Sequence, residues 1–258
     1  MELYFDHVLG KQKDKDFIFS LVSATFAPEE WEWAFQNGWA PIVSWFDSNF
    51  SNAHPLIWYQ CRQTRIKVSE YAPNRKTKKL LKNTPATYKI SNELSMDIKE
   101  IYSIYSSYCT YKDFGDILTF SDVEDYFKPI KGCTYFFIQF FYDNKPIAIT
   151  KLSLWGNTLL SEVFWWDYKN PELSLGKLSF YLEIELAKQL QLDYLYTGIS
   201  YNLDSMYKSD KKGFQFWTGR KWCSDTELFK YLCSQDDKIQ SIDELHEYQY
   251  LYLKRLNV

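Results

Sequence analysis

Residues 134–198 read TYFFIQFFYDNKPIAITKLSLWGNTLLSEVFWWDYKNPELSLGKLSFYLEIELAKQLQLDYLYTG, and this stretch decides the fold. It opens with three runs rich in aromatic and β-branched residues, 134–142, 146–155 and 158–167. The runs are separated by Asp143-Asn144 and Gly156-Asn157, which are typical of tight turns between strands. We therefore predict an antiparallel meander of three strands.

The meander leads through a polar loop into an amphipathic run, 175–190, which predicts a helix. A short apolar run, 194–198, predicts a buried strand after it. A helical crossover that follows a meander gives a mixed sheet, so the expected fold class is α+β with a GNAT-like acyltransferase domain. Ligands of such sheets tend to bind beyond the carboxyl ends of the strands.

The rest of the chain adds shorter elements. We predict helices at 29–36, from 91 onward, at 121–127 (opened by Ser121-Asp122) and at 225–234, strand-like sequence at 55–68, a hairpin at 213–222, and a helix or edge strand at 242–256. Trp31, Ala34 and Phe35 have helical spacing and are expected to face a core. Asn83-Thr84-Pro85 predicts a boundary between a smaller N-terminal α/β subdomain, 1–85, and the GNAT-like domain, 86–258.

Composition excludes several classes of protein. The 258 residues are 46% hydrophobic and 24% charged with a net charge of −3, as in ordinary globular proteins. Five scattered cysteines without a CxxC pair predict no metal site, and neither a GxxxxGK[ST] nor a GxGxxG motif occurs. No apolar run reaches the length of a membrane span. We expect a cytoplasmic monomer with no cofactor and no membrane contact.

One segment is strongly basic. Residues 62–82 contain eight Lys and Arg against Glu70 alone, a balance of +7 in a chain of net −3. Such a run is usually a solvated face. It is also what contact with a nucleic-acid backbone requires. Charge alone leaves both interpretations open.

The junction between the third strand and the helix suggests an anion site. Unpaired N–H groups at a helix N-terminus favour a negative group, Ser174 can cap the helix, and Gly176 permits close approach. GNAT enzymes place a Gln/Arg-x-x-Gly-x-Gly/Ala loop here for coenzyme A. The span ELSLGKL has a single glycine and no arginine, so it matches that loop poorly.

Two motifs resemble the arginyl- and leucyl-tRNA–protein transferases of the N-end rule. The first is LSEVFWWDYKNPELSLGKLSFYLEIELAKQLQLDYLYTG, followed by Met206, Tyr207 and Lys208, which resemble a KMxYK segment. The second is CRQTRIKVSEYAPNRKTKKLLKN, which begins at Cys61. The chain departs from the family in lacking its N-terminal cysteine cluster and the cysteine of CxKM, where Asp204-Ser205-Met206 stands.

The resemblance implies transfer of an amino acid from aminoacyl-tRNA to the amine of a protein or peptide acceptor. It favours reading the basic segment as a tRNA-binding surface made of Arg62, Arg65, Arg75, Lys76, Lys78, Lys79 and Lys82. The expected catalytic residues are Asp167, Glu162, Tyr196 and Tyr207. The expected substrate-binding residues are Ser174, Leu175, Gly176, Lys177, Trp166, Tyr181, Tyr201, Met206 and Lys208.

Three alternatives stay open. An acyl-CoA-dependent N-acyltransferase would share the fold but bind coenzyme A. A Fem-type enzyme would extend a different peptide from aminoacyl-tRNA. A catalytically silent relative would only bind protein or RNA. The sequence names neither the amino acid nor the acceptor.

Overall fold

The computed structural model describes residues 2–12, 15–41, 56–113, 118–201, 203–236 and 238, with side chains from residue 23 onward. The chain divides into two compact units that are each discontinuous in sequence. Unit 1 comprises Met1–Ile42, Ala53–Lys67 and Thr197–Val258, and unit 2 comprises Val43–Asn52 and Val68–Tyr196. The predicted domain boundary at residue 85 lies inside unit 2 and matches none of the positions where the chain passes from one unit to the other. The two predicted domains stay a prediction.

The predicted meander forms the centre of unit 2. Strands β7 (Thr134–Tyr142), β8 (Lys145–Trp155) and β9 (Thr158–Trp166) pair antiparallel. Asp143 and Asn144 both have positive φ, 50° and 60°, as a two-residue turn of type I′ requires. Gly156 supplies the positive φ, 59°, of the second turn. The antiparallel meander and its two tight turns are therefore confirmed.

The predicted crossover is also present in unit 2. A 3-10 turn η3 (Pro171–Leu173) and helix α5 (Leu175–Gln189) connect β9 to β10 (Tyr194–Ile199), which pairs parallel to β9 through Leu195 and Tyr196. With β6 (Thr87–Ser91), the strand order is β10-β9-β8-β7-β6. The mixed sheet and the α+β class are therefore confirmed, in the element order expected of a GNAT-like domain.

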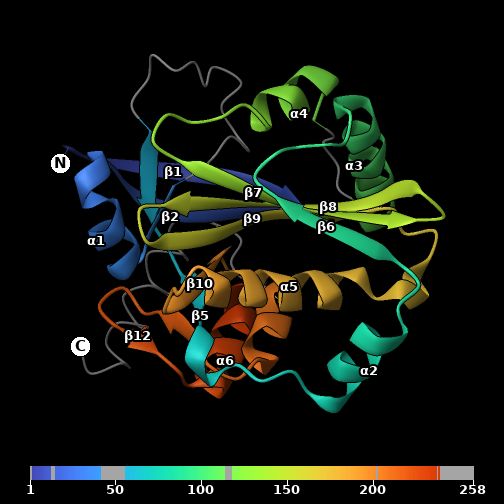
Figure 1. Cartoon of the computed structure of the whole chain (residues 1–258). Coiled ribbons are helices and arrows are strands. Elements are labelled where there is room, and N and C mark those ends of the chain that lie inside the picture. The colour runs from blue at the N-terminus through green and yellow to red at the C-terminus, as the bar shows by residue number, and fades with distance from the viewer. Residues whose placement is uncertain are drawn as a thin grey trace. The chain divides into compact units, whose positions relative to one another are not determined.

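Helices cover both faces of this sheet (Figure 1). On one face lie α3 (Ile98–Lys112) and α4 (Phe120–Tyr126), and on the other lies α5, with α2 (Arg75–Asn83) packed against it. Trp165, 1% exposed, packs its ring against Tyr105 at 4.8 Å on the α3 side. On the α5 side, Thr150 and Ser179 are 2.5 Å apart at their hydroxyls, and Ser179 donates to the buried Glu183.

Unit 1 contains two groups of strands. Strands β1 (Glu2–Gln12), β2 (Lys15–Thr25), β4 (Ile57–Gln60) and β3 (Trp39–Pro41) form a sheet in that order. Strands β5 (Gln63–Lys67), β11 (Phe214–Trp217) and β12 (Trp222–Cys223) pair antiparallel in the second group. The helices of unit 1 are η1 (Pro28–Glu30), α1 (Trp31–Gln36), η4 (Leu203–Asp210) and α6 (Thr226–Asp236).

Most local predictions are confirmed, with four corrections. The helix predicted from 91 onward begins only at Ile98, and Ser91 is the last residue of β6. Trp31, Ala34 and Phe35 are buried, as their spacing predicted. The strand predicted at 55–68 is in fact two strands, β4 and β5, because Cys61 and Arg62 between them are not in strand conformation. Helix α4 is capped by Thr119, whose hydroxyl accepts from the Asp122 N–H, rather than opened by Ser121. The hairpin of β1 and β2 was not predicted, and the element predicted at 242–256 lies outside the described residues.

Candidate active site

Asp167 follows the last residue of β9 and has a carboxylate held on two sides. Ser107 of α3 donates to it at 2.9 Å, and the Lys169 ammonium lies 2.9 Å away, although the Lys169 side chain is 79% exposed. Burial opposes ionisation of Asp167, but the hydrogen bonds from Lys169 and Ser107 outweigh it and lower the pKa of the carboxyl. The site thus presents an ionised carboxylate whose cation is accessible to solvent.

The N-terminus of α5 lies after the short loop that starts at Asp167. Ser174 adopts left-handed φ and ψ of 48° and 40°, and its side chain makes no capping hydrogen bond. The predicted side-chain cap is therefore wrong, because a capping residue has an extended backbone and Ser174 does not. The Ser174 carbonyl accepts from the Lys177 N–H at 3.0 Å. Within the described residues, the N–H of Gly176 has no acceptor. Gly176 and Lys177 are exposed, while Leu175 is fully buried and anchors the helix.

Gly176 also lies close to a side chain of the sheet. A Cβ added there would stand 3.4 Å from the Phe164 ring of β9, which is ordinary van der Waals contact. The glycine is therefore compatible with a side chain, and packing alone does not demand it.

Glu162 differs from Asp167 because its ion pair is buried rather than exposed to solvent. Its side chain is 3% exposed and pairs at 2.8 Å with Lys151, which is fully buried. Tyr126 donates to Glu162 at 3.2 Å, and the Lys151 ammonium stands 4.1 Å and 4.4 Å from the ring centres of Tyr126 and Tyr135. Because solvent does not reach this carboxylate, the structure gives Glu162 a place in the core rather than at a substrate.

The other aromatic residues of unit 2 that we predicted for the site differ in their exposure to solvent. Tyr196 is 2% exposed and Trp166 is 8% exposed, whereas Tyr181 lies half-buried on α5. Sequence reasoning missed two tyrosines close to Asp167. Tyr168 lies 4.0 Å from the ring of Trp166 and stacks on Tyr111 of α3 at 3.5 Å. Tyr111 and Tyr108 are three positions apart on α3, a helical spacing that could have identified this face.

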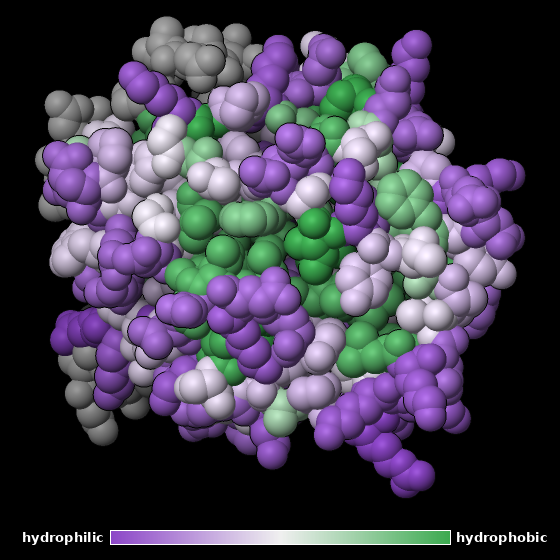
Figure 2. Space-filling model, viewed as in Figure 1, coloured by the Kyte–Doolittle hydropathy of each residue, from purple (hydrophilic) through white to green (hydrophobic). Residues whose placement is uncertain are grey.

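Five of the predicted tRNA-binding cations form one exposed surface. Arg75, Lys76, Lys78, Lys79 and Lys82 all lie on α2 and are exposed. No ion pair is found for any of them within the described residues. Asn74 caps the helix by accepting from the Thr77 N–H, and Figure 2 shows a strongly hydrophilic surface over α2. We call this set of five residues the α2 basic surface.

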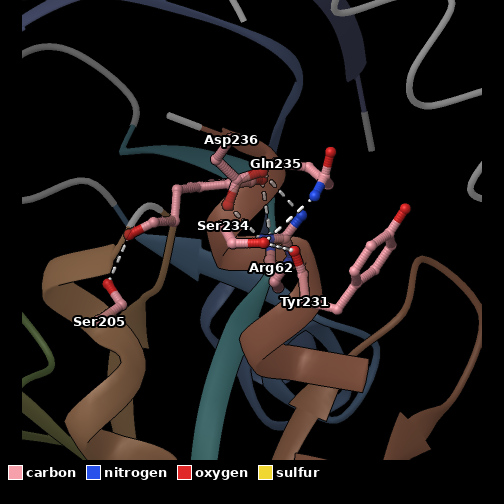
Figure 3. A network of polar contacts seen from close by, with 7 residues as sticks. Arg62, Ser205, Tyr231, Ser234, Gln235 and Asp236 are labelled. Atoms are coloured by element: carbon pink, nitrogen blue, oxygen red, sulfur yellow. Dashed lines mark hydrogen bonds and ion pairs between the residues drawn. The ribbon is translucent and has the colours of Figure 1, made fainter. Parts of the chain in front are cut away.

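The other two predicted cations are buried in unit 1. Arg62, 7% exposed, donates from both terminal nitrogens to Asp236, as Figure 3 shows. Arg65, also 7% exposed, donates to Gln215 and stacks 3.9 Å from the Trp222 ring centre. Neither guanidinium is open to a phosphate, so we keep the tRNA-binding prediction for the α2 basic surface only.

Lys208 is engaged within unit 1. Its ammonium donates to the carbonyls of Thr197 and Ile199 and to the Ser200 hydroxyl. Thr64, which sequence reasoning missed, joins this network through Ser200 at 3.0 Å. The lysine therefore ties η4 to the end of β10.

The other predicted residues of this region differ in exposure. The Tyr201 hydroxyl accepts from the Arg62 N–H, while Met206 is half-buried and Tyr207 is 59% exposed. Burial raises the pKa of Tyr201 well above its ordinary value, so its phenol stays protonated.

All five cysteines are free thiols. Burial raises the pKa of Cys61 far above its usual range, against the opposing charges of Lys208 and Arg62. In the part of the chain that the structure describes, no group of three or more His, Cys, Asp and Glu side chains gathers as metal ligands. Over the same residues, no helix combines the length and the apolar character needed to cross a bilayer.

Solved structures share a low level of similarity with this chain. A crystal structure of FemX aligns with a TM-score of 0.43 and 8% identity over 77% of this chain and 80% of that one. L-PGS from Bacillus licheniformis aligns with a TM-score of 0.41 and 10% identity, and the chain spans 51% of its length.

Sequence comparison is more informative. Residues 100–216 match the family described as "Arginine-tRNA-protein transferase, C terminus". An aspartate/glutamate leucyltransferase of Shewanella putrefaciens is 27% identical over 168 residues, which are 63% of this chain and 70% of the relative. That of Alcanivorax borkumensis is 24% identical over 172 residues, 65% and 70% of the two chains. The matched region contains the meander, Asp167 and α5, and over this region the chain is similar to the aminoacyl-tRNA–protein transferases.

Proposed function

We propose that the protein is an aminoacyltransferase that moves an amino acid from aminoacyl-tRNA to the amine of a protein or peptide acceptor. The observation that carries the proposal is the family match over residues 100–216, which includes the open carboxylate of Asp167 and the start of α5. The relatives are called aspartate/glutamate leucyltransferases, so leucine and acceptors that begin with aspartate or glutamate are the first substrates to test.

Asp167 is suited to hold the acceptor amine. Its lowered pKa makes it a weak base but a good anionic partner for an ammonium. The Lys169 ammonium already occupies one such position at 2.9 Å and is exposed enough to be displaced. We assign Lys169 the place that the acceptor ammonium takes when it binds.

The α2 basic surface supplies the contact with the tRNA backbone. Arg75 and Lys76 stand in the first turn of α2, where a helix dipole disfavours cations, and that turn has no acidic residue. Their position therefore costs the helix stability, which is unexpected of a merely solvated face. An exposed row of cations without internal partners is what phosphate contact requires.

The reaction itself demands little of the protein beyond placement. The bound ammonium first loses one proton to solvent. The neutral amine then attacks the ester carbonyl, an amide bond forms, the ester bond to the tRNA ribose breaks, and a second proton of the amine ends on the ribose oxygen. An aminoacyl ester is already activated, so alignment of the two substrates supplies much of the rate. The Gly176 N–H at the start of α5 is a donor for the ribose or terminal phosphate of the tRNA.

The experiment incubates the full chain with tRNA charged with labelled amino acids and a panel of acceptor peptides. Transfer of label to peptides with an acidic first residue supports the proposal. No transfer, together with thermal stabilisation by coenzyme A, would replace it with an acyl-CoA-dependent N-acyltransferase. Binding of charged tRNA without transfer to any peptide would indicate a silent relative.

We further infer that the protein works as a monomer in the cytoplasm, where thiols stay reduced. The five free cysteines support a reducing compartment. Sedimentation of the purified chain tests the monomer.

A further inference from the structure

A cluster of four aromatic rings borders Asp167, and the established family match assigns it no role. It consists of Tyr108 and Tyr111 of α3 and of Trp166 and Tyr168 at the end of β9, and we call it the aromatic platform. The rings of Tyr111 and Tyr168 are nearly parallel, 10° apart with centres at 3.5 Å. Trp166 and Tyr108 support Tyr168 at 4.0 Å and 6.0 Å.

The outermost ring of this platform is open. Tyr168 covers one face of the Tyr111 ring, yet Tyr111 is still 60% exposed. The exposure must therefore come from its other face and its edge. A flat ring with one face fixed by stacking and the other in solvent is a surface on which another flat ring can stack.

The surroundings of the platform indicate what stacks there. Ser107, next to Tyr108 on α3, donates to Asp167, so the platform and the open carboxylate share one end of the sheet. The charged residues next to its rings in the sequence balance one another, because the two lysines Lys112 and Lys169 are matched by the two aspartates Asp113 and Asp167. An uncharged aromatic surface fits a nucleobase better than it fits a phosphate.

We propose that the aromatic platform stacks an unpaired nucleobase of the 3′ end of aminoacyl-tRNA, with Tyr111 as the ring in contact. This inference rests on the proposed function, because it places the end of the donor beside the carboxylate that holds the acceptor. It divides the binding of tRNA between two surfaces of unit 2. The α2 basic surface provides salt-dependent backbone contact, and the platform provides contact that depends on the base.

The test measures binding of the full chain to a fluorescent RNA hairpin with a single-stranded ACCA 3′ end. Tyr111→Ala is expected to weaken binding about tenfold, in the range of one lost stacked base. The slope of affinity against salt should stay unchanged, and Tyr111→Trp should bind at least as well as the wild type. Tyr231→Ala, which removes an exposed tyrosine of α6, is the matched control and should bind like the wild type.

A second probe isolates the base. With a hairpin whose 3′ nucleotides lack bases, wild type and Tyr111→Ala should bind equally weakly. The proposal is overturned if Tyr111→Ala binds the intact hairpin within twofold of wild type, or if it weakens both hairpins alike. It is also overturned if the variant changes only the KM for the acceptor peptide, which would make the platform a peptide site.

The transfer assay separates this proposal from the proposed function. Transfer by wild type together with an unaffected Tyr111→Ala variant would reject the platform and keep the enzyme. Base-dependent hairpin binding without any transfer would keep the platform and reject the enzyme.

Discussion

Glu162 of β9 and Asp167, which directly follows β9, each pair with a lysine, and the two pairs differ in their exposure to solvent. Glu162 pairs with Lys151 at 2.8 Å, and the two side chains are 3% and 0% exposed. Asp167 pairs with Lys169 at 2.9 Å, and these side chains are 17% and 79% exposed. A buried pair cannot exchange its cation for a substrate, whereas an exposed pair can. Both pairs join a lysine to a carboxylate, so burial rather than residue type decides which carboxylate solvent can reach.

The largest effect is expected for Lys151→Met. Removing one partner leaves the Glu162 carboxylate buried without a cation, which costs about 3–5 kcal/mol in the free energy of unfolding. Lys169→Met, the matched change in the exposed pair, should cost less than about 1 kcal/mol. Urea denaturation measures both, and equal losses would break the comparison. Adding Glu162→Gln to Lys151→Met should recover part of the loss.

The second effect concerns the α2 basic surface. Lys78→Ala with Lys79→Ala should weaken tRNA binding and reduce the slope of log affinity against log salt by about two, one for each lost phosphate contact. Alanine is a good helix former, so α2 should stay folded. Lys131→Ala with Lys145→Ala removes two other exposed lysines of unit 2 as a control. If the control pair lowers the slope as much, the effect is one of net charge.

The smallest effect is expected for Lys169→Ala. Without the internal ammonium, the acceptor competes with nothing for Asp167, so the acceptor KM should fall by up to about fivefold while kcat is unchanged. The pKa of Asp167, followed by NMR titration, should rise toward the ordinary value of about 3.9. A higher KM would instead mean that Lys169 helps to bind the acceptor.

The same pair predicts how stability depends on pH. Because the folded pKa of Asp167 is lowered, its ionised form stabilises the fold above the ordinary aspartate range. That stabilisation is lost as the pH falls through the lowered pKa. The loss should be smaller in Lys169→Ala.

The sequence predicted the parts of this molecule that are decided locally. The meander followed from Asp143-Asn144 and Gly156, whose positive φ values the turns need. Helix α5 followed from its periodicity, and the place of Asp167 at the end of the third strand followed from the strand pattern. These features depend on neighbours within a few residues.

The predictions that failed depend on distant partners. Arg62 was expected on a basic surface, but Asp236, 174 positions away, pairs with it in the core. Arg65 is held by Gln215, 150 positions away. Glu162 looked like a catalytic carboxylate until the strand register placed Lys151 beside it. The sequence around a residue does not indicate a partner that lies so far away along the chain. Counting charges also does not distinguish buried cations from exposed ones.

We expect Asp167 to bind the acceptor and Glu162 to stabilise the fold. The most direct test measures unfolding free energy and transfer to an acidic acceptor peptide for Asp167→Asn and Glu162→Gln side by side. The account predicts that Asp167→Asn keeps its stability within about 1 kcal/mol and loses transfer at least about tenfold, the value of a charge-assisted hydrogen bond. It predicts that Glu162→Gln loses stability because Lys151 stays buried beside a neutral partner. Full transfer by Asp167→Asn, or a stable Glu162→Gln that no longer transfers, would contradict it.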